Sequence, residues 1–292
     1  MPRKGPFPPD IRGRLDFRIG GKNMIHDAFG ENYIHGFGPA EERRLREQAA
    51  VLAPVVFKDL PLPARGRLLE LGCGVGAELD LLAQLGPGLD LTGIDLSPSH
   101  LGAAQRHLGD GVALVRGDAG RLPFGDGTFD RVLTVWLLEH VRHPEAVLRE
   151  ALRVLKPAGR LICTEVDNAS FRFSPDLPAI RRWWDLFCRQ QQAAGGDPYI
   201  GRRLPGLAGE LGCGDIHWRD LPVVSSRLNP HRRAELLAYT EDLLASGAPR
   251  LLATGGADPA LLAAVRADFA QAREDKAIEF EYHAVQLSCG RH

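Results

Sequence analysis

The fold of this chain is decided by Leu68-Leu69-Glu70-Leu71-Gly72-Cys73-Gly74-Val75-Gly76 and by a second stretch, Gly93-Ile94-Asp95-Leu96-Ser97. The first stretch predicts a buried strand, a glycine-rich turn and the start of a helix, and the second predicts a strand that ends in a carboxylate. Glycine permits positive φ and a close approach of the backbone to a ligand. An acid at the tip of the second strand can accept both hydroxyls of a ribose. The two stretches therefore indicate a site for an adenosine-bearing cofactor.

Two kinds of cofactor compete for this pattern. A dinucleotide-binding loop has the spacing Gly-x-Gly-x-x-Gly, and its helix N-terminus carries a pyrophosphate. Here the glycines are Gly72, Gly74 and Gly76, and position 77 is Ala. Glu70 precedes them, and an anion there is a poor neighbour for a pyrophosphate but a good one for an ammonium group. Spacing and acid together favour a cofactor that carries an ammonium group.

Strands and helices alternate through the middle of the chain. Short apolar runs bounded by Gly or Asp predict strands near residues 67–71, 90–95, 112–116, 129–135 and 159–165. Helices are expected between them at about 76–85, 98–107 and 144–155, and before them from Pro39 to Leu52. This alternation implies an α/β fold, with a parallel sheet covered by helices on both faces.

The alternation stops after Glu165. Residues 170–211 are expected to be mostly helical, followed by a strand at 215–224, helices at about 231–246 and 258–275, and a final strand over 278–287. Leu211-Gly212-Cys213-Gly214 repeats part of the glycine motif, but no strand precedes it, so we interpret it as the C-terminal turn of a helix.

Further motifs follow in the order of a known family. Gly117-Asp118-Ala119 closes the third expected strand, Leu122-Pro123-Phe124 leads into the fourth, Leu137-Leu138-Glu139-His140 follows it, and Leu155-Lys156-Pro157 precedes the fifth. With the glycine loop these motifs cover roughly residues 66–166. In this set and order the chain resembles the class I S-adenosylmethionine-dependent methyltransferases that act on small molecules.

The resemblance implies a Rossmann-like sheet of seven strands, mostly parallel with an antiparallel last strand. It implies one domain over residues 39–292 with helical lid insertions at about 170–211 and 228–275, and a flexible N-terminal arm and cap over 1–38. It also implies S-adenosyl-L-methionine as the cofactor.

The resemblance places the cofactor contacts at the loop and the strand ends. Asp95 would hold the ribose, Asp118 would accept a hydrogen bond from the adenine amine, and Glu70 would face the methionyl end. The full expected set is Tyr33, Glu70, Gly72, Gly74, Gly76, Asp95, Leu96, Asp118, Ala119 and Trp136. Tyr33 belongs to a segment that looks like the cap of a subgroup in which a Tyr approaches the methionyl part. The alternatives are an aromatic that fills a gap at Tyr33 and a core residue at Trp136.

The acceptor side is less constrained by the sequence. His140 is the candidate general base, because His titrates near neutral pH, and a loop His with a structural role is the alternative. Subgroup-like motifs follow the fifth strand: Glu165-Val166-Asp167, a Gln-rich helix from Gln190 to Gly196, and Ile200-Gly201-Arg202. The expected acceptor contacts are Glu165, Asp167, Trp183 and Arg202.

Composition limits the remaining possibilities. Lys and Arg number 36 against 37 Asp and Glu, so no global field attracts nucleic acid or a membrane surface. No signal peptide or long apolar run is present, so a cytoplasmic location is expected. The five cysteines are scattered without metal-ligand spacing, which predicts reduced thiols and no metal site.

We expect a small-molecule acceptor and leave open a monomer or a homodimer. A nucleic-acid methyltransferase and a non-catalytic cofactor-binding scaffold are the alternatives.

Overall fold

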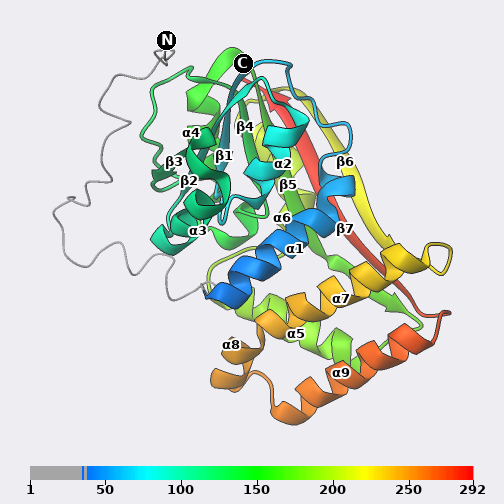
Figure 1. The fold of residues 1–292 in the computed structure, drawn as a ribbon. Coiled ribbons are helices and arrows are strands. Elements are labelled where there is room, and N and C mark those ends of the chain that lie inside the picture. The colour runs from blue at the N-terminus through cyan, green and yellow to red at the C-terminus, as the bar shows by residue number, and fades with distance from the viewer. Residues whose placement is uncertain (1–34, 36–37, 292) are drawn as a thin grey trace. The chain divides into compact units, whose positions relative to one another are not determined.

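The computed structural model describes His35 and residues 38–291 (Figure 1). A seven-stranded sheet has the order β3-β2-β1-β4-β5-β7-β6. The strands are β1 (Gly66–Leu71), β2 (Leu89–Asp95), β3 (Ala113–Arg116), β4 (Phe129–Val135), β5 (Leu155–Ser174), β6 (Gly214–Ser225) and β7 (Glu279–Gly290). Strands β1 to β5 are parallel, and β7 runs antiparallel between β5 and β6. The predicted sheet is confirmed.

The helices begin where the sequence provides start signals. Ser97 caps the third helix by accepting from the N–H of His100 at 3.2 Å, with Pro98 in the first turn as expected. The helices are α1 (Pro39–Val56), α2 (Ala77–Leu85), α3 (Pro98–Leu108), α4 (Pro144–Val154), α5 (Pro178–Ala193), α6 (Ile200–Glu210), α7 (Pro230–Ser246), α8 (Ala248–Ala253) and α9 (Pro259–Glu274). Two short 3₁₀ turns are η1 (Gly109–Gly111) and η2 (Leu138–His140).

Helices cover the sheet on both faces, as two neighbouring residues of β7 demonstrate. Leu287 lines a small apolar gap with Leu148 of α4 and Leu204 of α6. The side chain of Gln286 donates instead to the carbonyl of Val56, at the end of α1, at 2.9 Å. Because successive strand residues point to opposite faces, α4 and α6 lie on one face and α1 on the other.

The second half of the chain departs from the expected pattern in two places. The expected helical excursion starts late, because β5 continues to Ser174 through pairing with β7, for example Phe173 with Phe280. Helix α6 packs on the sheet strands β5 and β7 rather than with the other late helices. Gly212, at φ 71°, ends α6 in a tight turn with Cys213 N donating to Ala208 O at 3.0 Å, so the predicted C-terminal turn is confirmed.

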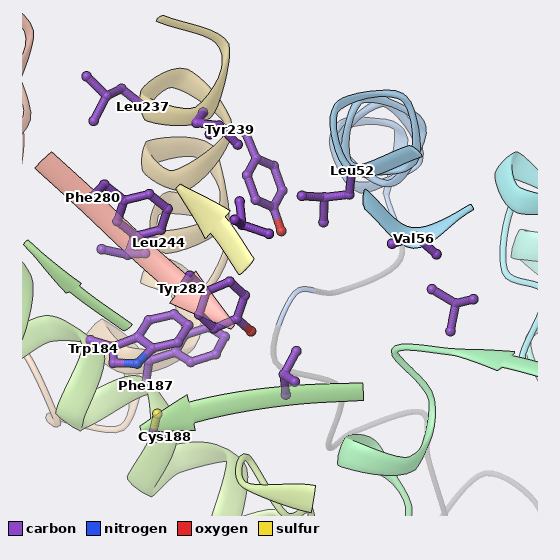
Figure 2. Close-up of a cluster of buried hydrophobic side chains, with 14 of the residues drawn as sticks. Leu52, Val56, Trp184, Phe187, Cys188, Leu237, Tyr239, Leu244, Phe280 and Tyr282 are labelled. Atoms are coloured by element: carbon purple, nitrogen blue, oxygen red, sulfur yellow. The ribbon is translucent and has the colours of Figure 1, made fainter. Parts of the chain in front are cut away.

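Helices α5, α7, α8 and α9 pack on one another and form what we call the lid. Its core is the apolar cluster in Figure 2, which draws side chains from α1, α5, α7 and β7. Trp184 stacks between Phe171, with ring centroids 4.0 Å apart, and Phe187, at 5.2 Å. No helix in the described part of the chain is long and apolar enough to cross a membrane.

Candidate cofactor and acceptor site

The glycine loop turns at the carboxyl end of β1. The N–H groups of Gly72 and Cys73 donate to the carbonyl of Ile94 in β2, at 2.8 and 3.0 Å. Gly72, Gly74 and Gly76 have φ values of 68°, 50° and 76°. Residues with a side chain rarely adopt this left-handed backbone conformation, which explains why the loop has glycine at all three positions.

The space around the three glycines differs. A Cβ at Gly72 would lie 2.7 Å from Leu137, and one at Gly76 would lie 2.7 Å from Leu108, so both are sites of close packing. At Gly74 a Cβ would meet no described atom within 4 Å. The loop is therefore closed on two sides and open at Gly74.

Carboxyl groups gather at this loop. Glu70 is 1 % exposed, and its Oε2 has no hydrogen-bond partner among the residues that the structure describes. Burial, reinforced by the nearby charges of Glu78 and Asp95, raises the pKa of Glu70 well above its usual range. Burial also raises the pKa of Glu78, in the first turn of α2, to about 7. A positively charged ligand group would stabilise the ionised form of such a buried carboxyl.

Asp95 ties the loop to the end of β2. Its Oδ2 accepts from Gly74 N at 2.9 Å and its Oδ1 accepts from Ser97 N at 2.8 Å. Each carboxylate oxygen keeps a second lone pair for a ligand hydroxyl. The structure thus places Asp95 beside the open glycine, with Leu96 partly exposed next to it.

Asp118 and Ala119 follow β3 at the same edge of the sheet. The carboxylate of Asp118 is exposed, and its Oδ1 accepts from Gly120 N at 2.8 Å. Ala119 is half-buried. Both are accessible from the strand ends that carry Glu70 and Asp95.

These residues fit S-adenosylmethionine better than a dinucleotide. The unpartnered oxygen of Glu70 suits an ammonium group, Asp95 suits a ribose, and Gly74 leaves room for a ligand against the backbone. Asp95 would repel a pyrophosphate at the same place, and so would Glu70 and Glu78 in their ionised forms.

The segment after β4 has an unusual backbone. Trp136 has φ 53°, a left-handed conformation that bulky residues rarely adopt, and its N–H donates to the carbonyl of Thr164 at 3.0 Å. Its side chain is half-buried and packs against the large apolar core, part of which Figure 2 draws.

His140 ends this segment and lies beside a second histidine. Its Nε2 is 3.7 Å from Oε1 of Glu139, and its side chain is 19 % exposed. The ring of His35 lies edge-on to that of His140, with centroids 6.2 Å apart, and 5.4 Å from that of Phe187. Nδ1 of His35 is 2.6 Å from Oγ of Ser246. Burial, then the charges of Arg44 and His140, lower the pKa of His35 well below its usual range.

The structure separates the residues predicted to bind the acceptor. Glu165 and Trp183 are fully buried; Glu165 accepts backbone N–H groups, and Trp183 donates its indole N–H to Leu244 O at 3.1 Å. These positions lie in the protein interior rather than on a surface that an acceptor can reach. Asp167 and Arg202 form a two-bond ion pair at 2.9 and 2.8 Å, with the Arg202 side chain 53 % exposed. Tyr33 and the predicted arm and cap, except His35 and Gly38, lie outside the described residues.

Sequence reasoning missed His35 and Glu78. Glu78 stands two residues after the last glycine of the loop, so its position in the first helical turn was a usable signal. His35 has no such signal, because only the fold brings it to His140. Across residues 38–291 and at His35, no group of three or more His, Cys, Asp or Glu side chains is placed to hold a metal ion.

The fold and the site together define a class of protein, a Rossmann-like α/β domain whose loop is built for an adenosine-bearing cofactor with a cationic amino acid end. The sequence model of the family described as "Methyltransferase domain" matches residues 69–163, from β1 to β5. This is the part of the chain that holds the glycine loop, Asp95 and Asp118.

Individual proteins extend the match. The chain is 35 % identical over 147 residues to 27-O-demethylrifamycin SV methyltransferase of Amycolatopsis mediterranei, covering 48 % of this chain and 53 % of that protein. It is 33 % identical over 169 residues to demethylmenaquinone methyltransferase of Staphylococcus aureus, covering 57 % and 67 %. The chain thus spans about half to two thirds of the length of these relatives. The solved structure of Haemonchus contortus phosphoethanolamine N-methyltransferase 2 with S-adenosyl-L-methionine shares the fold, with a TM-score of 0.55, 16 % identity and coverage of 86 % and 57 %.

The chain belongs to the class I S-adenosylmethionine-dependent methyltransferases. Members of this class use S-adenosyl-L-methionine as the methyl donor.

Proposed function

We propose that this protein binds S-adenosylmethionine at the glycine loop and transfers its methyl group to an O, N or C atom of a small-molecule acceptor. The observation that carries the proposal is the buried carboxyl of Glu70, whose Oε2 has no partner within the described residues, beside the open glycine Gly74. The names of the relatives, a rifamycin and a demethylmenaquinone methyltransferase, support a small molecule as the acceptor.

The cofactor supplies a methyl group on a sulfonium, which is already a good leaving group. The task of the chain is therefore to bind, orient and exclude water, and orientation alone contributes up to ~7–11 kcal/mol of barrier lowering. Glu70 would hold the ammonium group, Asp95 the ribose and Asp118 the adenine amine. Gly74 would let the cofactor lie against the backbone.

His140 is the residue that we propose as general base. An acceptor hydroxyl or carbon acid must lose a proton, and a positioned base accelerates that step by ~10²–10⁴-fold. The carboxylate of Glu139 lies 3.7 Å from Nε2 of His140. His35, which burial keeps neutral, lies beside it without adding a second charge.

The lid supports an apolar or planar acceptor. Phe171 is the partly exposed member of a stack with Trp184 and Phe187, which are 5 % and 3 % exposed, and Phe187 also contacts His35. An apolar or planar acceptor could therefore lie against Phe171, and Phe187 connects this stack to the histidine beside the proposed base.

Calorimetry tests the cofactor part of the proposal. S-adenosylhomocysteine should bind and NAD should not. Glu70→Gln should weaken S-adenosylhomocysteine at least tenfold, because the amide loses the charge that faces the ammonium group. The control is Asp90→Asn, which makes the same charge change at the end of β2 opposite to Asp95. This variant should not alter the affinity for S-adenosylhomocysteine. Equal losses in both variants would contradict the assignment.

Transfer of label tests the activity and the base. The protein is incubated with methyl-labelled S-adenosylmethionine and a cell extract, and the product that gains label is identified. His140→Ala should lower turnover of that acceptor at least tenfold with S-adenosylhomocysteine affinity unchanged, whereas His107→Ala on α3 should alter neither. Turnover at the wild-type level in His140→Ala would remove the base assignment, and label in RNA would favour the nucleic-acid alternative.

A further inference from the structure

A single buried carboxylate lies beneath the segment that carries Trp136 and His140. Both oxygens of Glu165 accept backbone hydrogen bonds: Oε1 from Leu137 N at 3.1 Å and Leu138 N at 2.9 Å, and Oε2 from Glu139 N at 3.3 Å. Glu165 has no exposed surface. Three of its partners are consecutive N–H groups of one turn, and the hydroxyl of Thr134 also donates to Oε1 at 3.4 Å. A carboxyl bonded in this way fixes a backbone rather than a ligand.

The lid contacts the same turn from the other side. The carbonyl of Glu139 accepts from Asp197 N at 2.9 Å and from Nε2 of Gln191 at 3.2 Å. The same amide nitrogen donates to Oε2 of Glu139 at 2.7 Å. Gln191 is 3 % exposed, so these bonds are made in the interior. Backbone and side chain of Glu139 are thus both held by the α5 region.

Two glycines allow this close approach. A Cβ at Gly196 would lie 2.3 Å from the carbonyl oxygen of Glu139, and a Cβ at Gly201 would lie 2.7 Å from that of Glu165. Neither glycine has an unusual φ in this structure, so the requirement is space and not conformation. The Gln-rich motif therefore lies against the turn formed by residues 137–139, and the Ile-Gly-Arg motif lies against the backbone of β5 at Glu165, which holds that turn.

The backbone at the start of this segment needs such support. A bulky residue in the left-handed region costs roughly 1–2 kcal/mol and persists where its surroundings impose it. Trp136 has φ 53° and makes one backbone hydrogen bond, to Thr164. The residues that follow it are the ones that Glu165 and Gln191 hold.

We propose that Glu165 and Gln191 are positioning residues that clamp the turn at 137–139 between the sheet and the lid, and so set the placement of Trp136 and His140. The part of this proposal that concerns catalysis rests on the proposed methyltransferase function. Glu165 acts through the backbone, because its carboxyl has no exposed surface and accepts all three N–H groups of the turn. Gln191 couples the same turn to α5, so that movement of the lid would reach His140.

Fluorine NMR tests the clamp on the free protein. The chain has four tryptophans, so fluorotryptophan labelling gives a small set of signals, and Trp136→Phe assigns the one that matters. Glu165→Gln keeps the shape of the side chain but leaves one oxygen for three N–H groups. The Trp136 signal should shift or broaden in Glu165→Gln, and in Gln191→Leu to a smaller extent.

The matched control is Arg233, which anchors a different turn in the same manner. Its guanidinium is 5 % exposed and donates to the carbonyls of Ile278 at 2.6 Å and Asp275 at 3.1 Å, and to that of Ala272. Arg233→Gln also breaks buried backbone bonds, but it should leave the Trp136 signal in place. An unchanged Trp136 signal in Glu165→Gln, or the same change in Arg233→Gln, would overturn the proposal.

Kinetics then tests the consequence for catalysis. With the labelled acceptor, Glu165→Gln should lower kcat at least tenfold and leave the KM of the acceptor within about threefold, and Arg233→Gln should leave both near wild type. An effect confined to KM would indicate that Glu165 contacts the acceptor after all. If the wild type transfers no methyl group, the proposed function fails while the NMR result still decides the clamp.

Discussion

Two buried glutamates lie on the strands that flank β4, and their carboxyl groups meet opposite surroundings. Glu70 in β1 is 1 % exposed and Glu165 in β5 has no exposed surface. Burial raises the pKa of both, that of Glu165 to about 8. The carboxylate of Glu165 accepts three backbone N–H groups, whereas Oε2 of Glu70 has no partner in the described part of the chain.

The difference shows that burial alone does not distinguish a structural acid from a binding one. A buried polar group that is fully bonded holds the protein together, and one that is left unbonded costs free energy that a ligand can recover. The sheet therefore leaves a buried oxygen of Glu70 available to the proposed cofactor, whereas the carboxyl of Glu165 is bonded to the turn at residues 137–139.

The largest effect is expected at Gly74. Gly74→Val should weaken S-adenosylhomocysteine more than 100-fold, because the new side chain would enter the open space beside Glu70 and Asp95. Gly212→Val is the control, since Gly212 has φ 71° and equally open surroundings in the turn after α6. Both variants should lose a similar ~1–2 kcal/mol of unfolding free energy from the left-handed backbone. Calorimetry and urea unfolding measure the two quantities, and intact affinity in Gly74→Val would show that the ligand does not lie there.

The next largest effect distinguishes the two glutamates by their contributions to the unfolding free energy. Glu165→Leu should lower the unfolding free energy by about 2–4 kcal/mol, since three N–H groups lose their acceptor. Glu70→Leu should leave the unfolding free energy unchanged or higher, because a buried carboxyl with an unbonded oxygen is replaced by an apolar side chain of similar size. Denaturant unfolding of the free proteins measures both. A large loss in Glu70→Leu would mean that Glu70 already stabilises the free protein.

The same comparison explains how much the sequence could predict. The glycine spacing, Glu70 and Asp95 lie within one strand-turn-helix unit and the strand after it, so local rules were enough to predict the loop and its geometry. The five parallel strands and their helices followed from alternation, and their bounds agree to within a few residues except in β5. The extension of β5 to Ser174 escaped prediction because pairing with β7, about a hundred residues later, creates it.

The acceptor end depended on contacts that no local pattern contains. Glu165 was expected to touch the acceptor, but its bonds to residues 137–139 arise from the packing of two parallel strands. His35 approaches His140 only through the fold. Trp183 was expected at the acceptor, and the packing of α5 against the end of α7 buries it instead. Sequence motifs thus identified the segments that meet, but not which side chains face a ligand.

A smaller effect is expected in the pH dependence of cofactor binding. The pKa of Glu70 is raised in the free protein and that of Glu78 is raised to about 7, so near neutral pH these carboxyls hold protons that an ammonium group would displace. Ligand binding then releases protons, and affinity for S-adenosylhomocysteine should rise severalfold from about pH 6 to pH 8. Calorimetry in buffers of different ionisation enthalpy counts the protons released. Glu70→Gln should reduce that number, and an unchanged number would assign the release to another group.

The smallest effect should come from the ion pair of Asp167 and Arg202, in which the arginine is exposed. Their two hydrogen bonds are short, yet the Arg202 side chain is 53 % exposed, and solvent screens such a pair. Arg202→Gln should lower the unfolding free energy by less than about 1 kcal/mol, and roughly 1 M salt should remove the difference, because the Debye length is then about 3 Å. Arg203→Gln, which breaks the exposed pair with Asp197, should behave alike. Arg202→Gln alone could instead lower the unfolding free energy by more than about 2 kcal/mol, with no recovery at high salt. The Asp167–Arg202 pair would then be, like Glu165, part of the structure that supports the proposed acceptor site. The expected small loss would show that hydrogen bonds and ion pairs at this edge of the sheet stabilise the fold only where they are buried.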